Sequence, residues 1–501
     1  MKTIRLKTIY IIVLFSIFNL SGLYSQNESN KLSFEQAVAI TKEKSHVIKQ
    51  ANYLQQEKKE LVKAAKGLYL PKFGISAQYM AMSEDLHLDL TPVKDAIVPL
   101  YQALGTYGNF SVTGVPDNIA TQMIRAKMKD GLSSVENGEW DKLIQKKQFG
   151  TINATFDWPV YVGGKIRAAN KAANIQLSDA DEAERQKESE LMSELVERYY
   201  GLCLAKQAEK VRTDVLKGME KHLQDAIKLE HEGLIANADV LNVKVFYSQA
   251  ERELNKSRRS SAIINQALQN TLAKEDESKI EPISLLFYLD TIENMDYFKN
   301  LAKRNNPILH QVEAKKQLSI QNYNAEKSNY FPIVAITGMY DIINKDLSPY
   351  TPDWMIGVGM KWTLFDGASR YRKIKAASLK TEQVKEYQLK AASDIETVID
   401  KLYQELGMYK EQLTDLETAE TYAREYLRVR EKGFQEEMTN STEVVDARLA
   451  LSKILIERLE SMYKYDITLS KLLEFSGISE QFTLYQRNPS TKTASYQLEN
   501  K

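Results

Sequence analysis

The sequence predicts a mainly α-helical fold with a small β part, in which long antiparallel helices are joined to short strands. Three observations lead to this prediction. The chain has only 21 glycines and 11 prolines among 501 residues, about half the usual share of these helix breakers. No proline interrupts 160–281 or 353–488. Several segments of the first half also recur in the second half, so the length reflects two copies of one unit rather than several globular domains.

Composition excludes several classes of function. Basic and acidic residues number 67 each, so the chain has no net field that would attract nucleic acid. The five histidines show no metal-ligand spacing, and we find no phosphate-binding glycine loop and no nucleophile elbow. We therefore expect no catalytic residue, no metal site, no cofactor and no enzymatic activity.

Residues 1–25 have the layout of a secretory signal peptide. Lys2, Arg5 and Lys7 precede an apolar run from 9 to 18, which is followed by small and turn-forming residues. The run is short for a transmembrane helix, and an uncleaved anchor is the alternative. The one cysteine, Cys203, excludes an intrachain disulfide and is expected to pack as a small apolar side chain.

Two segments of the first half recur in the second half at different offsets. The segment around Pro71 recurs around Pro332, at 332 − 71 = 261, and the segment around Trp158 recurs around Trp362, at 362 − 158 = 204. The first half therefore carries 261 − 204 = 57 extra residues between these points. We place them in an insertion at 83–148.

A third match lies further along the chain. It pairs Gly233 with Gly433, and 239–241 with 443–445. Each copy then consists of a helix, a strand, a loop, a second strand, a very long helix, a turn and a returning helix. We accordingly divide the chain into a signal peptide (1–25), a first repeat with the insertion (26–280), a second repeat (281–478) and a C-terminal polar tail (479–501).

Four short strands are expected, two in each repeat. Residues 150–158 and 354–363 alternate between apolar and polar side chains, and weaker runs follow the two prolines. Such alternation fits half-buried strands of a small soluble sandwich, and with aromatic ends it also fits transmembrane strands. Four strands cannot close a barrel alone, whereas three chains supply twelve. The aromatic residues expected at the interface with outer-membrane lipid are Tyr79, Trp158, Trp354 and Trp362.

The helices are too long for a compact domain. Helical patterns run without interruption from 164 to about 229 and from 368 to about 431, and each would span roughly 100 Å. Apolar residues at 395, 399, 402, 406, 409, 413 and 416 repeat every 3.5 residues, as in a coiled coil. Shorter helices are expected at 33–69 and 295–329, and returning helices at 239–273 and 442–476.

This order of parts resembles the TolC-like outer-membrane efflux protein family over about 32–478. The resemblance is carried by LSFEQAVAIT, AKGLYLPKF, EKSNYFPIV, WPVYVGGKIRA and WTLFDGASRYR. It implies a homotrimer in the outer membrane of a Gram-negative bacterium. A twelve-stranded β-barrel would lie in the membrane, and a twelve-helix coiled-coil tunnel would project into the periplasm. An adaptor protein and an inner-membrane pump would engage the tip of the tunnel.

The resemblance also assigns residues at the two helical turns. It implies a pore constriction at Asp239, Glu443 and Asp446. The adaptor would contact Gly233, Leu234, Gly433 and Phe434. A capping role for the acidic residues is the alternative, because acids in a first helical turn are stabilised by the helix dipole. The second turn is four residues longer than the first, and the latch of tyrosine and arginine found in the family is not visible, since Arg430 and Gln435 occupy those positions.

The sequence thus predicts an outer-membrane exit duct for efflux or type I-like secretion, passive and gated at its periplasmic tip. A periplasmic coiled-coil scaffold or adhesion protein with small soluble sheet domains is the alternative. The insertion at 83–148, with two short helices near 92–104 and 117–130, either covers the barrel mouth or contacts an extracellular partner, or is a neutral elaboration of the surface.

Overall fold

The computed structural model describes residues 31–110, 117–274 and 279–494, and the predicted signal peptide lies outside them. The fold is mainly helical with a minor part of β-strands, as the sequence predicts. It divides into two compact units. The helical unit comprises the described parts of Met1–Val62, Lys171–Gln321 and Ala377–Lys501, and the strand unit comprises Lys63–Asn170 and Asn322–Ala376.

Four helices have the long uninterrupted course that the sequence predicts. They are α6 (Lys165–His231), α7 (Asn237–Thr271), α10 (Ser369–Gln435) and α11 (Ser441–Phe475). The helices α6 and α10 have 67 residues each, and α7 and α11 have 35 each. Their starting residues differ by the same amount, 369 − 165 = 204 and 441 − 237 = 204. The spacing first seen around the two tryptophans therefore continues to the end of the returning helices.

Each of the two shorter predicted helices is a pair of helices. The first pair is α2 (Phe34–Lys44) with α3 (His46–Gly67), and the second is α8 (Met295–Asn305) with α9 (Pro307–Ser328). The breaks fall at Ser45 and Asn306, whose ψ angles of 126° and 120° are not helical. Asn306 precedes a proline, which disfavours helical backbone at that residue. Its Oδ1 also accepts hydrogen bonds from the N–H groups of Ile308 and Leu309, at 2.9 and 3.1 Å, and so caps α9.

The core of the helical unit combines the predicted apolar stripe of α10 with an aromatic cluster. The stripe residues Ile395, Ile399, Leu402, Leu406 and Leu413 are buried. Neighbouring rings of the cluster lie 5.3 to 6.0 Å apart between centroids, a range in which aromatic pairs attract. Its members are Phe34, Tyr199, Tyr200, Phe287 and Phe482.

Part of the segment predicted as a polar tail packs into this core. A short 3-10 helix η1 (Ser479–Gln481) leads into α12 (Phe482–Gln486), where Phe482 and Tyr485 are buried. The strand β10 (Thr491–Ala494) then pairs antiparallel with β7 (Leu286–Leu289). A second small pairing joins β1 (Lys31–Leu32) to β6 (Glu281–Pro282) in parallel.

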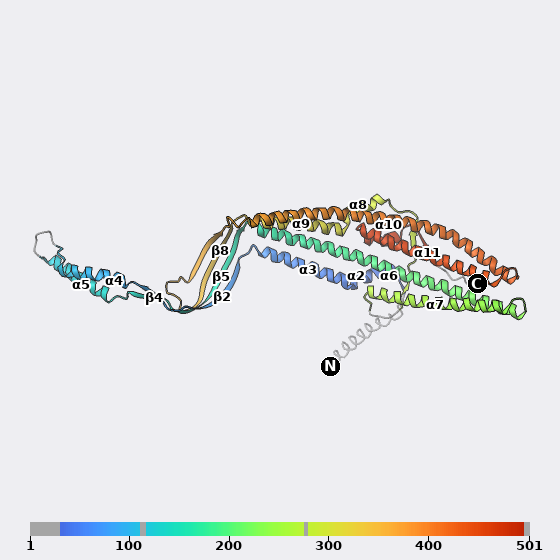
Figure 1. Ribbon diagram of the computed structural model, residues 1–501, viewed down its shortest axis with the longest axis horizontal. Helices are drawn as coiled ribbons and strands as arrows, with labels where there is room; N and C mark the ends of the chain where they lie inside the picture. The colour runs from blue at the N-terminus through green and yellow to red at the C-terminus, as the bar shows by residue number, and fades with distance from the viewer. Residues whose placement is uncertain (1–30, 111–116, 275–278, 495–501) are drawn as a thin grey trace, which may run out of the picture. The chain divides into compact units, whose positions relative to one another are not determined.

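The strand unit is built on one antiparallel sheet of four strands. They are β2 (Lys72–Ala81), β5 (Gln148–Val162), β8 (Ile333–Lys345) and β9 (Trp354–Lys361), in the spatial order β2-β5-β8-β9 (Figure 1). Both predicted alternating runs form strands, and β5 extends beyond its predicted ends. Within the described residues, β2 and β9 each have one edge without a partner strand.

The insertion between β2 and β5 forms a hairpin of its own. A two-stranded ribbon of β3 (Leu86–Asp89) and β4 (Asp141–Gln145) leads into α4 (Thr91–Tyr107) and α5 (Ile119–Glu136), which lie side by side (Figure 1). Both helices lie where the sequence predicts them, and both are longer. The described part of the chain thus has six short strands beyond the four that the sequence predicts.

No helix in the described ranges is both long enough and apolar enough to cross a membrane.

Candidate membrane strands and tip hairpins

The two faces of the four-stranded sheet differ in polarity. Apolar side chains of all four strands share one face, because the register places them directly opposite one another. On this face Val358 is 73% exposed. The other face has most of the polar side chains, although Met339 and Met355 also lie on it, and its Asn153, opposite Ser76 and Asp341, is only 6% exposed. A sheet that packs on a soluble core shows the reverse, whereas a lipid-facing sheet has its apolar face outward.

Aromatic residues lie at both ends of this sheet. Trp158 and Trp362 belong to the end where the long helices begin, and Tyr79 and Trp354 to the end that carries the insertion. All four side chains are exposed. Tyrosine and tryptophan favour the two interfaces of a membrane, where an apolar ring can keep a polar atom in water. The predicted interface residues thus occupy two belts with the apolar strand surface between them.

The two tryptophans at the helical end make the same hydrogen bond. The Trp158 indole N–H donates to the backbone carbonyl of Tyr69 at 3.0 Å, and the Trp362 indole N–H donates to that of Tyr330 at 3.1 Å. Each bond ties the start of one strand to the end of its neighbour. Two residues with positive φ follow each tryptophan, at 163–164 and 367–368, and they turn the chain sharply into the long helices.

The first tip hairpin joins α6 to α7. After α6 ends at His231, Gly233 adopts a φ of +79°, a left-handed conformation that glycine adopts without strain. Its N–H donates to the carbonyl of Glu230 at 2.9 Å, and the N–H of Leu234 donates to that of Leu229 at 2.9 Å. These two bonds form the Schellman pattern that closes a helix. The side chain of Leu234 is exposed.

The second tip hairpin joins α10 to α11 with the same hydrogen-bond pattern. Here Glu437 has the left-handed backbone, with a φ of +60°. Its N–H donates to the carbonyl of Phe434 at 3.2 Å, and the N–H of Met438 donates to that of Gly433 at 2.7 Å. The residue equivalent to Gly233 is therefore Glu437, at 437 − 233 = 204. Met438, which is 78% exposed, is equivalent to the exposed leucine of the first hairpin.

The sequence match of Gly233 with Gly433 was wrong by four residues. Gly433 lies inside the last turn of α10 and is buried. A Cβ atom at Gly433 would lie 2.8 Å from the Thr439 Cγ2 atom, so glycine is needed there for close packing rather than for the turn. The residues from Gly433 to Gln435, which the sequence placed in the second turn, are the last residues of α10. The two hairpin turns have the same length.

A small core supports both hairpins. Phe434 is 4% exposed and packs with Ala226, Val240 and Val444. Its ring meets the buried His222 ring edge-on, with 4.6 Å between centroids, and the His222 Nε2 lies 2.8 Å from the Ser441 hydroxyl. The predicted tip residue Phe434 therefore packs inside the hairpins, while Leu234 lies outside.

Burial is the main cause of a lowered pKa at His222, because a charged imidazolium would lose its hydration there. The hydrogen bond with Ser441 acts in the opposite direction, and so does the charge of Asp225, whereas the nearby charge of Arg448 lowers the pKa further. The neutral ring is thus the form that suits the folded hairpins.

Asp239, one of the predicted constriction residues, caps the start of α7. Its carboxylate accepts a hydrogen bond from the Ala236 N–H at 3.2 Å, and the Asp239 N–H donates to the Ala236 carbonyl at 2.9 Å. This is the role that the capping alternative expected, and the negative charge also lies favourably at the positive end of the helix.

Glu443 both caps α11 and forms an ion pair. The Glu443 N–H donates to the Asn440 side-chain oxygen at 2.9 Å, and the Asn440 amide donates to the Glu443 carboxylate at 3.0 Å. The Arg430 guanidinium lies 2.5 Å from the other carboxylate oxygen of Glu443. The same guanidinium lies over the Tyr426 ring, 5.0 Å from its centroid. Arg430 thus links the end of α10 to the start of α11.

Asp446 lies one helical turn beyond Glu443 on α11, and its side chain is exposed. Residues three apart on a helix share a face. The two acids thus form a short acidic strip beside the second hairpin.

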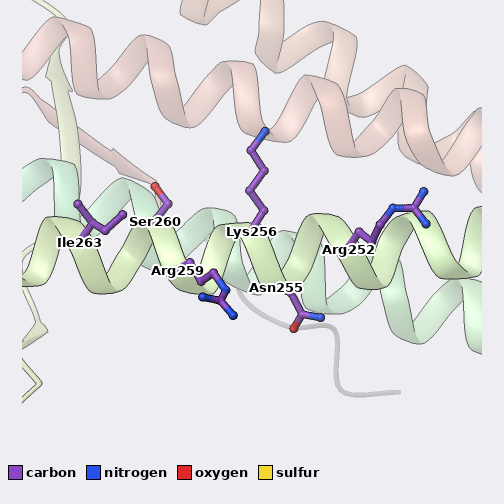
Figure 2. A pocket seen from close by; sticks show the side chains of 6 residues that line it. All are labelled: Arg252, Asn255, Lys256, Arg259, Ser260 and Ile263. Atoms are coloured by element: carbon purple, nitrogen blue, oxygen red, sulfur yellow. The ribbon is translucent and has the colours of Figure 1, made fainter.

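Away from the tip, α7 has an exposed basic face. Arg252, Lys256 and Arg259 line an open hollow along the helix together with Asn255, Ser260 and Ile263 (Figure 2). The other side of α7 packs on the chain's own core through Leu254 and Leu268. The exposed face therefore combines positive charge with an uncovered isoleucine.

The family described as outer membrane efflux protein matches 131–274 and 299–477, which is more than half of the chain. The chain belongs to this family. Its members are passive channels of the Gram-negative outer membrane with a helical tunnel in the periplasm, and they are not enzymes. This assignment agrees with the exposed apolar face of the four-stranded sheet and with the long helices. No curated protein sequence matches the chain.

Solved structures of similar fold include several outer-membrane proteins. A membrane protein from Pseudomonas aeruginosa is 12% identical, with a TM-score of 0.69 and 90% of each chain covered. The outer membrane protein VceC from Vibrio cholerae is 13% identical, with a TM-score of 0.66, covering 89% of this chain and 96% of its own. The CmeC outer membrane channel of Campylobacter jejuni is 11% identical, with a TM-score of 0.65, covering 92% of this chain and 89% of its own.

The sequence of this efflux family member did not predict what Arg430 and Met438 do at the tips. Arg430 lies thirteen positions before its partner Glu443, and no local pattern in the sequence pairs residues across a turn of unknown length. Met438 was not predicted because its turn has Glu437 in the left-handed conformation, where glycine is the usual residue. The offset of 204 residues between the two repeats does identify Met438 as the equivalent of Leu234, since 438 − 234 = 204.

Proposed function

We propose that three copies of this chain form an outer-membrane exit duct for efflux or type I-like secretion. Four strands from each copy would close a twelve-stranded barrel, and the long and returning helices would form a twelve-helix tunnel. The observation that carries the proposal is the four-stranded sheet, which has an exposed apolar face between two aromatic belts and a polar opposite face. Lipid would cover the apolar face, and the polar face would line a water-filled lumen.

The free edges of the sheet support closure by several copies. Within the described strands, β2 and β9 have unpaired outer edges. Unpaired backbone groups are very costly in lipid, so a membrane sheet must close on itself. About eight strands are the practical minimum for such a barrel, and three copies of four strands exceed it. Corresponding helices of the two halves have equal lengths and start at constant offsets of 204 or 261 residues, which supports an internal two-fold repeat. Three copies with two repeats each would give the duct an approximate sixfold symmetry.

A pair of lysine variants tests the duct against a soluble scaffold. Val358 is on the apolar face of β9, and its neighbour Gly357 is on the polar face with open space around it. In the duct, Val358→Lys would place a charge in lipid at a cost of about 2–4 kcal/mol per chain, whereas Gly357→Lys would face water. We expect Val358→Lys to abolish recovery of heat-modifiable oligomers from outer membranes and Gly357→Lys to retain them. Equal behaviour of both variants, or a water-soluble wild-type monomer, would refute the duct.

The periplasmic gate is proposed to lie at the tip hairpins. In a trimer, Asp239, Glu443 and Asp446 would each become a ring of three carboxylates, which favours cations in the pore. The ion pair of Glu443 with Arg430 and the exposure of Asp446 support a role for the second hairpin in closure. The capping contact of Asp239 makes its part in the constriction secondary.

Single-channel recording tests the gate. The double variant Glu443→Gln with Asp446→Asn removes six charges from a trimer and should change conductance and weaken block by divalent cations. The exposed Glu411, on α10 away from the hairpins, provides the matched control Glu411→Gln, which should conduct as the wild type does. An unchanged conductance and block in the double variant would reject the constriction assignment.

An adaptor protein and an inner-membrane pump are the proposed partners at the tip. Gly233, Leu234, Gly433 and Phe434 are the proposed contact region. The exposed Leu234 would provide direct contact, whereas the buried Gly433 and Phe434 would hold its shape. The exposed Met438 adds a second apolar side chain in the equivalent position. Substituting Leu234 and Met438 by Glu should block export by the assembled pump while leaving single-channel conductance unchanged; unaffected export would exclude this contact.

A further inference from the structure

The helical hairpin of the insertion is held together by one face of α4. The Tyr101 ring lies against Gly131, and the Arg125 guanidinium donates a hydrogen bond to the Gly108 carbonyl at 2.8 Å. At the other end of the hairpin, the Lys94 ammonium donates to the Glu136 carbonyl at 2.8 Å. These contacts attach α4 to α5 along their length (Figure 1).

A second face of α4 is apolar and exposed. The residues on it step by three, four, three and four positions, which is the 3.5-residue spacing of a coiled-coil seam. Leu100 is 56% exposed and Tyr107 is 82% exposed, although both are large apolar side chains. We call this face the α4 stripe, and its members are Val93, Ala96, Leu100, Ala103 and Tyr107.

We propose that the α4 stripe is the seam of a parallel three-helix coiled coil, formed by α4 of three copies of this chain. The proposal rests on the trimeric assembly proposed above and identifies a contact that this assembly would make through the insertion. The three α5 helices would lie outside the three α4 helices, because the contacts with α5 occupy a different face of α4. The three insertions would then form one cap.

The pattern of the α4 stripe favours an identical helix as its partner. A threefold axis presents three parallel copies of the same stripe to one another, and a heptad seam is complementary to itself in that arrangement. Positions that flank such a seam often carry charges that select or reject a partner. Here the flanking residues on the open side are Pro99 and Thr106, which are uncharged. Three identical helices could thus approach without repulsion between like charges.

Side-chain sizes along the stripe also fit close helices. The alanines at 96 and 103 alternate with larger residues along the stripe. The small side chains would let the three helices approach closely, and the larger ones would fill the space along the axis.

The position of α4 in the chain brings it near the boundary between copies. The insertion follows β2 directly, and β2 is an edge strand whose open side would meet β9 of the next copy in the proposed barrel. A helix that follows this strand would emerge next to the neighbouring copy. The coiled coil would therefore continue an interface that the barrel itself requires.

Cysteine crosslinking of the full-length protein tests the proposal. Cys203 is buried and is replaced by alanine to give a cysteine-free background. Leu100→Cys places one thiol in the stripe, and Lys127→Cys places one on the exposed outer side of α5 as a matched control. A disulfide needs Cα atoms within about 4.4–6.8 Å of each other, which seam residues of adjacent helices reach. Under mild oxidation we expect covalent dimers of Leu100→Cys in several-fold higher yield than of Lys127→Cys.

A second pair of variants keeps the test independent of folding. Ala103→Lys would place three like charges at the axis, and Gln102→Lys places the same charge one residue away, outside the stripe. In the Leu100→Cys background, we expect Ala103→Lys to reduce the dimer yield several-fold and Gln102→Lys to leave it unchanged.

The mass of the detergent-solubilised oligomer is measured on every sample, which separates two failures. A trimer in which Leu100→Cys crosslinks no better than Lys127→Cys, or crosslinks to a different protein, overturns the coiled coil and leaves the duct intact. A wild type that forms no trimer overturns both.

Discussion

The two tip hairpins have the same backbone and different chemistry. Both close with the Schellman pattern, at Gly233 in the first and Glu437 in the second. At the position of Arg430 in the second hairpin, the first has the buried Ala226, since 430 − 226 = 204. Only the second hairpin therefore has an ion pair across its turn. Helix lengths and turn geometry are thus the same in the two hairpins, whereas the second has an arginine next to the turn that pairs with the acid at the start of the returning helix.

The largest effect is expected in the small core that the two hairpins share. Phe434→Ala would remove a fully packed ring, and such changes cost about 3–5 kcal/mol. The equivalent residue of the first hairpin is Glu230, so Glu230→Ala should have little effect. Hydrogen exchange of the Val240 and Val444 amides would report the difference. Because both hairpins rest on this one ring, we expect faster exchange in both; an effect confined to the second hairpin would show that the two cores are separate.

Acid should loosen the same core through His222. Its folded-state pKa is lowered chiefly by burial, while the unfolded value is about 6.5. The unfolded chain therefore binds the proton more readily than the folded chain. The contribution of neutral His222 to the free energy of unfolding is fully present above a pH of about 6.5 and is lost as the pH falls below this value. Thermal unfolding followed against pH should show this loss. His222→Gln, which keeps a polar partner for Ser441, should flatten the profile, and Tyr426→Phe at the equivalent position should not.

The turn residues should respond in opposite directions. Gly233 has open space around its Cβ position, so Gly233→Ala costs only backbone strain, of about 1 kcal/mol. Glu437 already bears that strain, and Glu437→Gly should stabilise the second hairpin by roughly 0.5–1 kcal/mol. Limited proteolysis at the tip offers a direct comparison. If Glu437→Gly accelerated cleavage, the strained conformation would not be a significant cost.

The smallest expected effect concerns the ion pair. The side chains of Arg430 and Glu443 are 32% and 37% exposed, and such pairs are worth at most about 1 kcal/mol and weaken with salt. Glu443→Gln should therefore destabilise the second hairpin at low salt and have less effect at high salt. Asp239→Ala in the first hairpin removes the acceptor of the Ala236 N–H but breaks no ion pair, so its effect should vary less with salt. Equal salt dependence would remove the proposed asymmetry.

Much of the fold could be predicted because its signals are local. The spans without proline predicted α6 and α10 within a few residues, and the alternation around Trp158 predicted β5. The capping alternative for Asp239 and Glu443 was also recognisable, since a cap depends on residues three positions apart. The four-residue error at Gly433 arose because glycine is a common turn residue, while the chain used a strained Glu437 for the turn and the glycine for packing against Thr439.

The sequence by itself determined the long helices, the four strands of the main sheet and the alternation of their side chains, because these follow from periodicity and from the placement of helix breakers. Only the tertiary structure decided which distant groups meet. The pairing of Arg430 with Glu443, the burial of Phe434 against His222 and the packing of Phe482 from the predicted tail into the aromatic cluster are examples. The physical reason is that such contacts depend on the relative rotation and axial position of whole helices. These are set by many weak packing interactions along the helices, and no single segment of the sequence contains all of them.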